Sequence, residues 1–173
     1  MLTTTGSVEL KEHPIIITLQ DTISGNGFLA RITLSGRTLM RWEDGKWWMY
    51  GVRPAAIAES GSNINESFLR FRQAYEGVLF DVAQESKDFD EFRTEVERFF
   101  NEGDADEQSW ENALKAVRDS KMVPPEPFSG LARQSPDSRP VRIEVERLDG
   151  KIKPFAASEN VPDTYSVADK QAA

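Results

Sequence analysis

A short run of aromatic residues is the part of this sequence with the clearest chemical potential. Basic residues flank the run, and the whole set comprises Arg41, Trp42, Lys46, Trp47, Trp48, Met49, Tyr50 and Arg53. Aromatic rings beside cationic side chains can stack the bases of single-stranded nucleic acid. The same rings can instead form the core between a sheet and a helix, where aromatic side chains supply much of the buried area. We favour the core and keep base stacking as the alternative.

Residues suited to catalysis are scarce. The chain contains 1 histidine, His13, and 0 cysteines, which removes thiolate catalysis and cysteine-based zinc sites. Because Glu12 and Pro14 flank His13 in a polar N-terminal segment, we expect His13 to be a solvated residue. The serines then have no partner base. The sequence therefore predicts a protein that is not an enzyme.

Acidic and glycine-rich clusters have simpler explanations than ligand binding. The acidic clusters are Asp88, Asp90 and Glu91, and then Glu102, Asp104, Asp106 and Glu107. Neither has the spacing of a calcium-binding loop, whereas acidic residues are favourable at helix N-termini. The turns around Gly25 and Gly61 lack the Gly-Lys-Ser/Thr continuation of a phosphate-binding loop. We predict no metal site and no cofactor.

A hairpin must position the aromatic run. The turn Glu43-Asp44-Gly45-Lys46 has Asp-Gly at its centre, which is the strongest short-range hairpin signal. We therefore expect antiparallel strands over 37–42 and 46–52. Successive side chains of a strand leave on opposite faces. Half of the aromatic run must then face away from the other half.

A capped helix follows the hairpin. A short strand of small residues is predicted over 55–59, and Ser60-Gly61-Ser62 should end it. Asn63 is placed as a helix N-cap, with Glu66 able to return a hydrogen bond to the N–H of the cap itself. The helical face over 63–84 then contains Phe68, Phe71, Tyr75, Val78, Leu79 and Val82. This helix should lie across the sheet.

The remaining elements complete one domain. Strands are predicted over 15–19 and 28–34, helices over 88–101 and from a cap at Asp104, and a returning strand over 141–148. We divide the chain into a flexible arm (1–13), a single domain (14–150) with a Pro-rich loop (122–140), and an extended or disordered tail (151–173). The predicted fold class is α+β: an antiparallel β-meander sheet of roughly five strands, a long amphipathic helix on one face, and two further helices extending that layer.

The order of these elements resembles the HicB-like antitoxin domain over residues 37–85. The positions that match are Asp44, Gly45, Tyr50, Pro54, Gly61, Glu66 and Ser67. The resemblance implies a HicB-like fold, a role as an antitoxin-type inhibitor of a small toxin, and a homo-oligomer. It also implies that the partner-binding residues are Trp47, Trp48, Tyr50, Arg53 and Glu59. The DNA-binding unit of the family is not evident, so the resemblance does not extend to autorepression.

The negative net charge of the chain is complementary to a basic protein partner. With 21 basic and 29 acidic residues the net charge is −8, which repels phosphate backbones and makes nucleic-acid binding by the whole chain unfavourable. No stretch approaches the length of a membrane span, and the N-terminus lacks the basic start and apolar core of a signal peptide. We therefore predict a cytoplasmic protein-binding domain that inhibits a small basic toxin. The alternative is single-stranded nucleic-acid binding through the aromatic strand.

Overall fold

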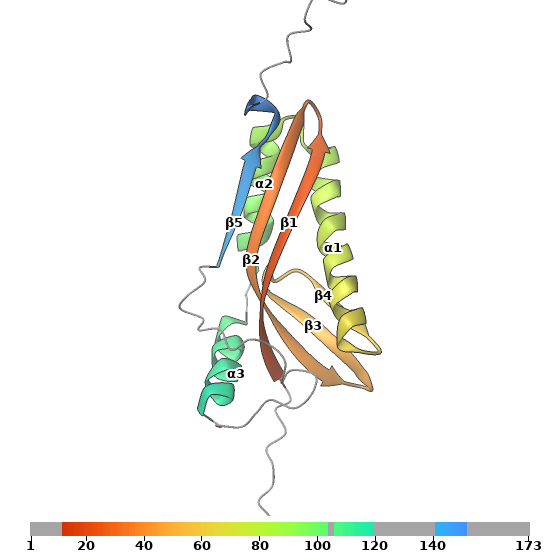
Figure 1. Cartoon of the computed structure of the whole chain (residues 1–173), viewed down its shortest axis with the longest axis vertical. Helices are drawn as coiled ribbons and strands as arrows, with labels where there is room; N and C mark the ends of the chain where they lie inside the picture. The colour runs from red at the N-terminus through yellow and green to blue at the C-terminus, as the bar shows by residue number, and fades with distance from the viewer. Residues whose placement is uncertain (1–11, 104–105, 120–140, 152–173) are drawn as a thin grey trace, which may run out of the picture.

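The computed structural model describes residues 12–103, 106–119 and 141–151 (Figure 1). Its elements in chain order are β1 (Glu12–Gly25), β2 (Phe28–Glu43), β3 (Lys46–Arg53), β4 (Ala58–Gly61), α1 (Ile64–Glu85), α2 (Phe89–Asn101), α3 (Glu107–Asp119), β5 (Arg142–Arg147) and the short 3-10 helix η3 (Asp149–Lys151). This is the predicted α+β class, with an antiparallel five-stranded sheet. The Pro-rich loop, the tail from residue 152 and most of the N-terminal arm lie outside the described residues.

Strand β2 is the centre of the sheet. It pairs with β1 along its whole length on one side. On its other side, residues 30–35 pair with β5 and residues 37–43 pair with β3, which in turn pairs with β4. One long strand therefore serves two different neighbours on the same side. The predicted return of the last strand to the sheet is confirmed, with β2 as its partner.

Three strand boundaries differ from the prediction. Strand β2 runs without interruption from Phe28 to Glu43, so the two strands predicted over 28–34 and 37–42 are one strand. Strand β1 runs from Glu12 to Gly25, far beyond the predicted 15–19, because the backbone pairs with β2 without interruption. Within this strand, the Asp21 carboxylate forms an ion pair with Arg72 of α1 at 3.0 Å. Strand β4 begins at Ala58 and continues to Gly61, so the predicted break at Ser60-Gly61 is wrong as well. Pairing with neighbouring strands outweighed the local preferences in all three places.

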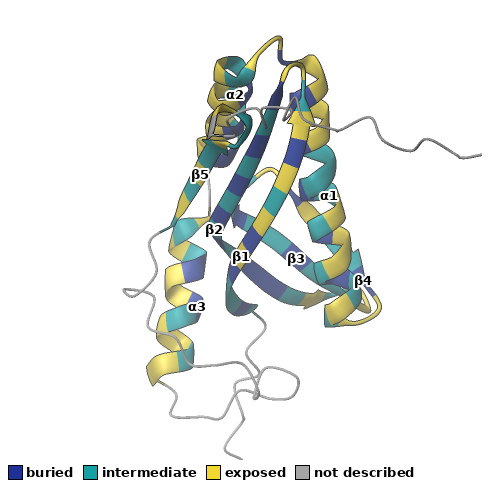
Figure 2. Ribbon diagram, turned by 45° about the horizontal axis from the view of Figure 1, so that its top comes forward, coloured by how far each residue is buried: buried dark blue, intermediate teal, exposed yellow. Residues whose placement is uncertain are grey.

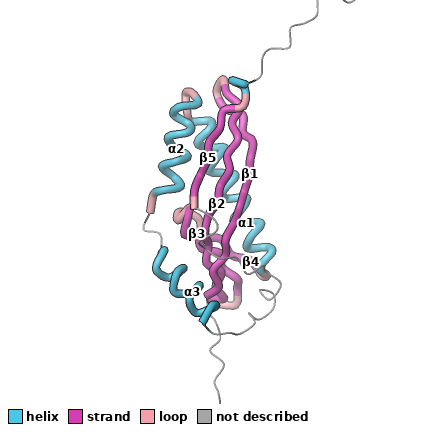
Figure 3. The backbone as a smooth tube through the Cα atoms, turned by 60° about the vertical axis from the view of Figure 1, so that its left-hand side comes forward, coloured by secondary structure: helices cyan, strands magenta, loops and turns pink. Residues whose placement is uncertain are grey.

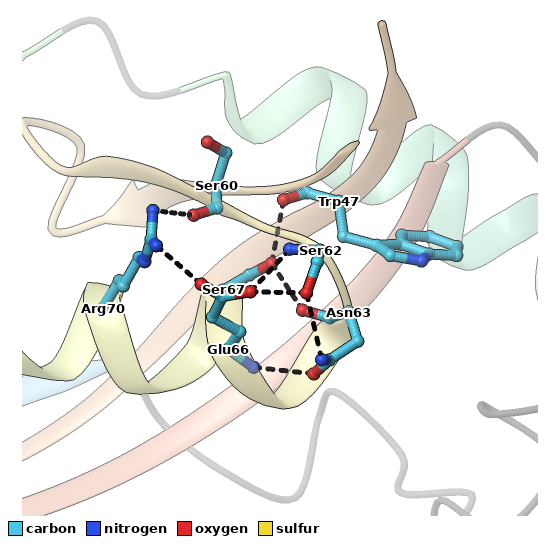
Figure 4. Close-up of polar contacts among 7 residues, drawn as sticks. All are labelled: Trp47, Ser60, Ser62, Asn63, Glu66, Ser67 and Arg70. Carbon is cyan, nitrogen blue, oxygen red and sulfur yellow. Dashed lines mark hydrogen bonds and ion pairs between the residues drawn. The ribbon is translucent and has the colours of Figure 1, made fainter. Parts of the chain in front are cut away.

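Helix α1 begins where the sequence predicts. The side chain of Asn63 accepts a hydrogen bond from the Glu66 N–H at 2.9 Å (Figure 4). The return bond differs, however: the Glu66 carboxylate accepts from the N–H and hydroxyl of Ser62, at 2.7 and 2.6 Å, rather than from the cap's own N–H. At the opposite end, the Asn26 side chain in the β1–β2 turn donates to the carbonyl of Ser86 at 2.8 Å. The C-terminal end of α1 is thus attached to the β1–β2 turn.

Helix α2 extends the α1 layer, but α3 does not. The main core lies between the sheet and the first two helices, and it includes Ile17, Ile32, Met49, Phe71, Tyr75, Leu79, Phe92 and Val96. A second, smaller core contains Leu39 and Val52 packed against Trp110 and Ala113 of α3. Leu39 is the strand neighbour of Met40, which belongs to the main core, so α3 lies on the opposite face of the sheet. The expectation that α3 would extend the α1 layer is therefore wrong. Figure 3 shows α3 below α2, towards the end of the sheet where β3 and β4 lie.

Candidate functional site

Strand β3 separates the aromatic run between the two faces of the sheet. Trp47 and Met49 pack against the main core, beneath α1. Trp48 and Tyr50 leave on the opposite face, where both are half-buried. Their rings stack on each other with centroids 5.7 Å apart and planes 16° from parallel. The prediction that the run must divide between two faces is confirmed.

Charged side chains surround this stack. The Arg41 guanidinium lies 5.2 Å from the centre of the Tyr50 ring. It forms ion pairs with Glu43, at 2.9 Å, and with Glu12 of β1. We call Glu12, Arg41, Glu43, Trp48 and Tyr50 the Trp48 surface. Two carboxylates share one guanidinium there, so the surface has an excess of negative charge.

The Tyr50 hydroxyl completes this network. It donates a hydrogen bond of 2.8 Å to Glu43. That bond, together with the contact from Arg41, lowers the pKa of the Glu43 carboxyl below its ordinary value. Burial, and then the adjoining Glu43, raises the pKa of Tyr50. Glu43 therefore stays ionised and Tyr50 stays neutral over the physiological pH range.

Helix α3 borders the Trp48 surface and forms ion pairs with the other nearby arginines. Glu107 accepts hydrogen bonds from Arg37 at 3.0 Å and from Arg53 at 3.1 Å. Arg37 also lies 4.3 Å from the centre of the Trp110 ring. Both guanidinium groups thus hold α3 against the sheet. Helix α3 begins at Glu107 and Asp106 is its cap, accepting a hydrogen bond from the Ser109 N–H at 3.1 Å, so the predicted cap at Asp104 is wrong.

The structure brings together only some of the predicted partner-binding residues. Trp48 and Tyr50 form one surface, and Arg53 lies beside it in the ion pair with Glu107. Trp47 faces the main core on the other side of the sheet, and Glu59 is opposite Met49 in β4. The five residues therefore do not form a single site.

Sequence reasoning missed the acidic members of the Trp48 surface. The Asp44-Gly45 turn makes Glu43 and Lys46 a pair, and the same register places Arg41 opposite Trp48. This cross-strand pairing could be predicted from the turn alone. The pairing of Glu12 with Arg41 could not be predicted, because it depends on the register of β1 with β2.

His13 is buried, so the expectation of a solvated residue is wrong. Its side chain lies within β1 with 7% of its surface exposed. Burial lowers the pKa of His13 to about 4, so the imidazole is neutral at pH 7. The cause is pairing with Met40 in β2, which draws the start of β1 into the sheet.

Two further features concern metal binding and membranes. Among residues 12–103, 106–119 and 141–151, no cluster of three or more His, Cys, Asp or Glu side chains is arranged to hold a metal ion. Likewise, none of the helices in the described part combines the length and apolar content needed to cross a lipid bilayer.

Comparisons with protein-family models, curated proteins and solved structures found no significant match to this chain.

Proposed function

We propose that this protein is a non-catalytic protein-binding domain whose partner is a basic protein, bound at the Trp48 surface. The observation that supports this most directly is the stacked Trp48–Tyr50 pair beside two carboxylates that share a single guanidinium. Aromatic faces attract cations, and Trp and Tyr are the residues that most often dominate the energy of protein interfaces. The excess of carboxylate supplies the complementary charge.

The same charges disfavour the alternative of single-stranded nucleic acid. A base-stacking site needs free cations close to the rings to hold the phosphates. Arg41 is shared by two carboxylates, and Arg37 and Arg53 both contact Glu107. A net charge of −8 adds a long-range repulsion.

The family resemblance narrows the proposed partner. A HicB-like domain neutralises a small toxin in the cytoplasm, and a basic toxin would match the acidity of this chain. The antitoxin role and the HicB-like label are therefore parts of the proposal that rest on the resemblance, whereas the proposed cytoplasmic location rests on the composition, with 0 cysteines. The protein-binding role rests on the chemistry of the Trp48 surface.

Fluorescence anisotropy of a labelled ligand tests the choice between these classes. The full-length chain would be titrated into a lysine- and arginine-rich peptide, and separately into a single-stranded DNA of equal length, at two salt concentrations. We expect saturable binding of the peptide and none of the DNA. Tighter binding of the DNA would overturn the proposal.

Two tryptophan variants locate the site. Trp48→Ala should weaken peptide binding by about tenfold or more, as expected for a central aromatic anchor. Trp42→Ala is the matched control, because Trp42 is 50% exposed but is paired with Trp47, on the other face of the sheet. Equal affinities of the two variants would contradict this assignment.

The antitoxin role has its own test. If a small basic protein encoded beside this chain inhibits cell growth when expressed alone, co-expression with this chain should restore growth only if the role is correct.

A further inference from the structure

The turn between β1 and β2 consists of Asn26 and Gly27. The register pairs Gly25 with Phe28, so the two turn residues lie outside the ladder. Both are exposed, and Gly27 has a positive φ of 75°, which glycine adopts without strain. Asn26 is also the one asparagine of this sequence that a glycine follows. The turn therefore combines an exposed asparagine side chain with an unhindered neighbour.

The side-chain amide of Asn26 holds the end of α1. Its Nδ2 donates hydrogen bonds to the carbonyl of Ser86, at 2.8 Å, and to the carbonyl of Gln84, at 3.4 Å. Ser86 is the C-cap of α1, and carbonyls at a helix C-terminus have no partner within the helix. Figure 2 shows the β1–β2 turn beside the connection between α1 and α2, at one end of the molecule. The amide thus connects two segments that are distant in the sequence.

The same turn contacts two further elements. The Arg147 guanidinium, at the end of β5, donates to the Gly27 carbonyl at 3.1 Å. The ring of Phe28, directly after the turn, lies 5.8 Å from the ring of Phe89 and 5.0 Å from that of Phe92, both in α2. The turn therefore joins α1, α2 and β5, and a covalent change within it affects all three.

An Asn-Gly pair can modify itself. The backbone nitrogen of Gly27 forms a bond to Cγ of Asn26, the bond from Cγ to Nδ2 breaks, and ammonia leaves, which closes a succinimide ring. Water then opens the ring at one of its two carbonyl groups and leaves either aspartate or isoaspartate. The absence of a side chain on Gly27 keeps its nitrogen accessible. A Cβ built on Gly27 would meet no atom within 4 Å, so the space beside the turn is open as well.

Either product removes the connection to α1. An aspartate carboxylate has no hydrogen to donate, so its oxygens would face the carbonyl oxygens of Gln84 and Ser86. This end of α1 is also the negative end of the helix dipole, where a new negative charge is unfavourable. Isoaspartate in addition lengthens the backbone of the turn by one carbon atom. Hydrogen bonding is thereby replaced by repulsion.

We propose that Asn26 is a site of spontaneous deamidation, and that its conversion to aspartate or isoaspartate detaches the C-terminal end of α1 from the β1–β2 turn. The hydrogen bonds of the amide must open before the Gly27 nitrogen can attack, so the reaction follows local opening of this end of α1. The change needs only water and is irreversible. Because the turn and the Trp48 surface lie at opposite ends of β2, this inference is independent of the proposed function.

Mass spectrometry tests the reaction. The full-length chain would be incubated at mildly alkaline pH in water enriched in heavy oxygen, and then digested in ordinary water. We expect conversion at Asn26, with a heavy oxygen incorporated when the ring opens. Asn65 and Asn101 are internal references, because both are exposed but are followed by glutamate. Conversion of Asn26 no faster than that of these references would overturn the proposal.

A variant of the neighbouring residue tests the route. Gly27→Asp keeps Asn26 but places a side chain beside the attacking nitrogen, and aspartate tolerates a positive φ better than most residues. The variant should convert Asn26 much more slowly than the natural chain. An equal rate would show that the Gly27 nitrogen is not the nucleophile and would overturn the proposal.

Asn26→Asp tests the structural consequence, because it makes the aspartate product directly. Hydrogen exchange of the last-turn amides of α1 should accelerate by about fivefold or more, since this end loses its hydrogen bonds to the turn, and the midpoint of thermal unfolding should fall. Asn65→Asp is the matched control: it makes the same chemical change in the first turn of α1, where negative charge is favourable, and should not lower the midpoint. Unchanged exchange in Asn26→Asp would show that the amide does not hold the helix end, which would overturn the proposal.

Discussion

The hydroxyl of Ser67, in the first turn of α1, donates a hydrogen bond of 2.8 Å to the main-chain carbonyl of Trp47 in β3 (Figure 4). The helix can approach the sheet this closely because residue 61 is glycine: a Cβ there would lie 2.6 Å from the Ser67 nitrogen. The start of α1 is therefore attached to the strand that carries the aromatic run. Any displacement of α1 would change the position of β3 and of the Trp48 surface.

Ser67→Ala should lower the free energy of unfolding by about 1 to 2 kcal/mol, because it removes the hydrogen bond that the Ser67 hydroxyl donates to the Trp47 carbonyl in a part-buried site. Urea denaturation followed by circular dichroism measures the change. Ser24→Ala is the control, since Ser24 is exposed in β1, and it should change stability by less than about 0.5 kcal/mol. Equal stability of the Ser67 variant and the natural chain would show that this bond contributes nothing.

Glu107→Gln should loosen α3, because one carboxylate accepts hydrogen bonds from both Arg37 and Arg53. We expect a loss of about 1 kcal/mol, given that all three side chains are partly exposed. Hydrogen exchange should show faster exchange of the α3 amides, while α1 remains unchanged. Glu111→Gln, an exposed position in the same helix, is the matched control. Uniform acceleration in both helices would show that α3 is not anchored separately.

Tyr75→Phe should leave stability unchanged or raise it by about 1 kcal/mol. Tyr75 is 0% exposed and its hydroxyl has no hydrogen-bond partner among the described residues. The substitution therefore removes a buried hydroxyl whose loss of hydration no hydrogen bond compensates. Tyr50→Phe provides the contrast, because it removes the hydroxyl that donates to Glu43 at 2.8 Å, and it should be destabilising. Thermal unfolding of both variants gives the comparison. A destabilised Tyr75→Phe variant would mean that the hydroxyl is hydrogen-bonded in solution.

Acid should destabilise the fold through His13. The pKa of this residue is about 4 in the folded chain and 6.5 in its ordinary, exposed state. Below pH 6.5 the unfolded chain therefore binds a proton that the folded chain excludes, so stability falls by up to about 1.4 kcal/mol per pH unit until pH 4, and the full loss is on the order of 3 kcal/mol. Above pH 6.5 this contribution is constant.

Nuclear magnetic resonance can follow this group without ambiguity, because the chain contains 1 histidine. The imidazole signal should not titrate between pH 7 and pH 5. The free energy of unfolding should decrease as the pH is lowered from 7 to 5 in the natural chain. In His13→Asn it should remain nearly constant over the same range. Burial raises the pKa of Asp21, and this shift makes the folded chain gain stability as the pH falls, opposite in sign to the effect of His13, so the measurement stops at pH 5. A midpoint near 6.5 in the folded protein would contradict the prediction.

Local signals in the sequence determined the hairpin, the N-caps and the amphipathic helices. Asp44 has a positive φ of 50° and Gly45 one of 74°, as the Asp-Gly turn requires. Asn63 and Asp88 cap their helices through side-chain acceptors. Each of these features depends on residues only a few positions apart, which is why the sequence alone could predict them. The division of the aromatic run between two faces followed from strand alternation in the same way.

Only the tertiary structure decided which segments lie next to each other. The burial of His13, the ion pair of Glu12 with Arg41, and the position of α3 on the face opposite α1 all depend on pairing between distant segments. The free energy of these contacts comes from buried area and register along β2, neither of which is visible in a short stretch of sequence. The sequence by itself therefore determined the elements and the residues that could form a binding surface. Long-range packing selected Trp48 and Tyr50 for that surface and packed Trp47 against the main core on the other face.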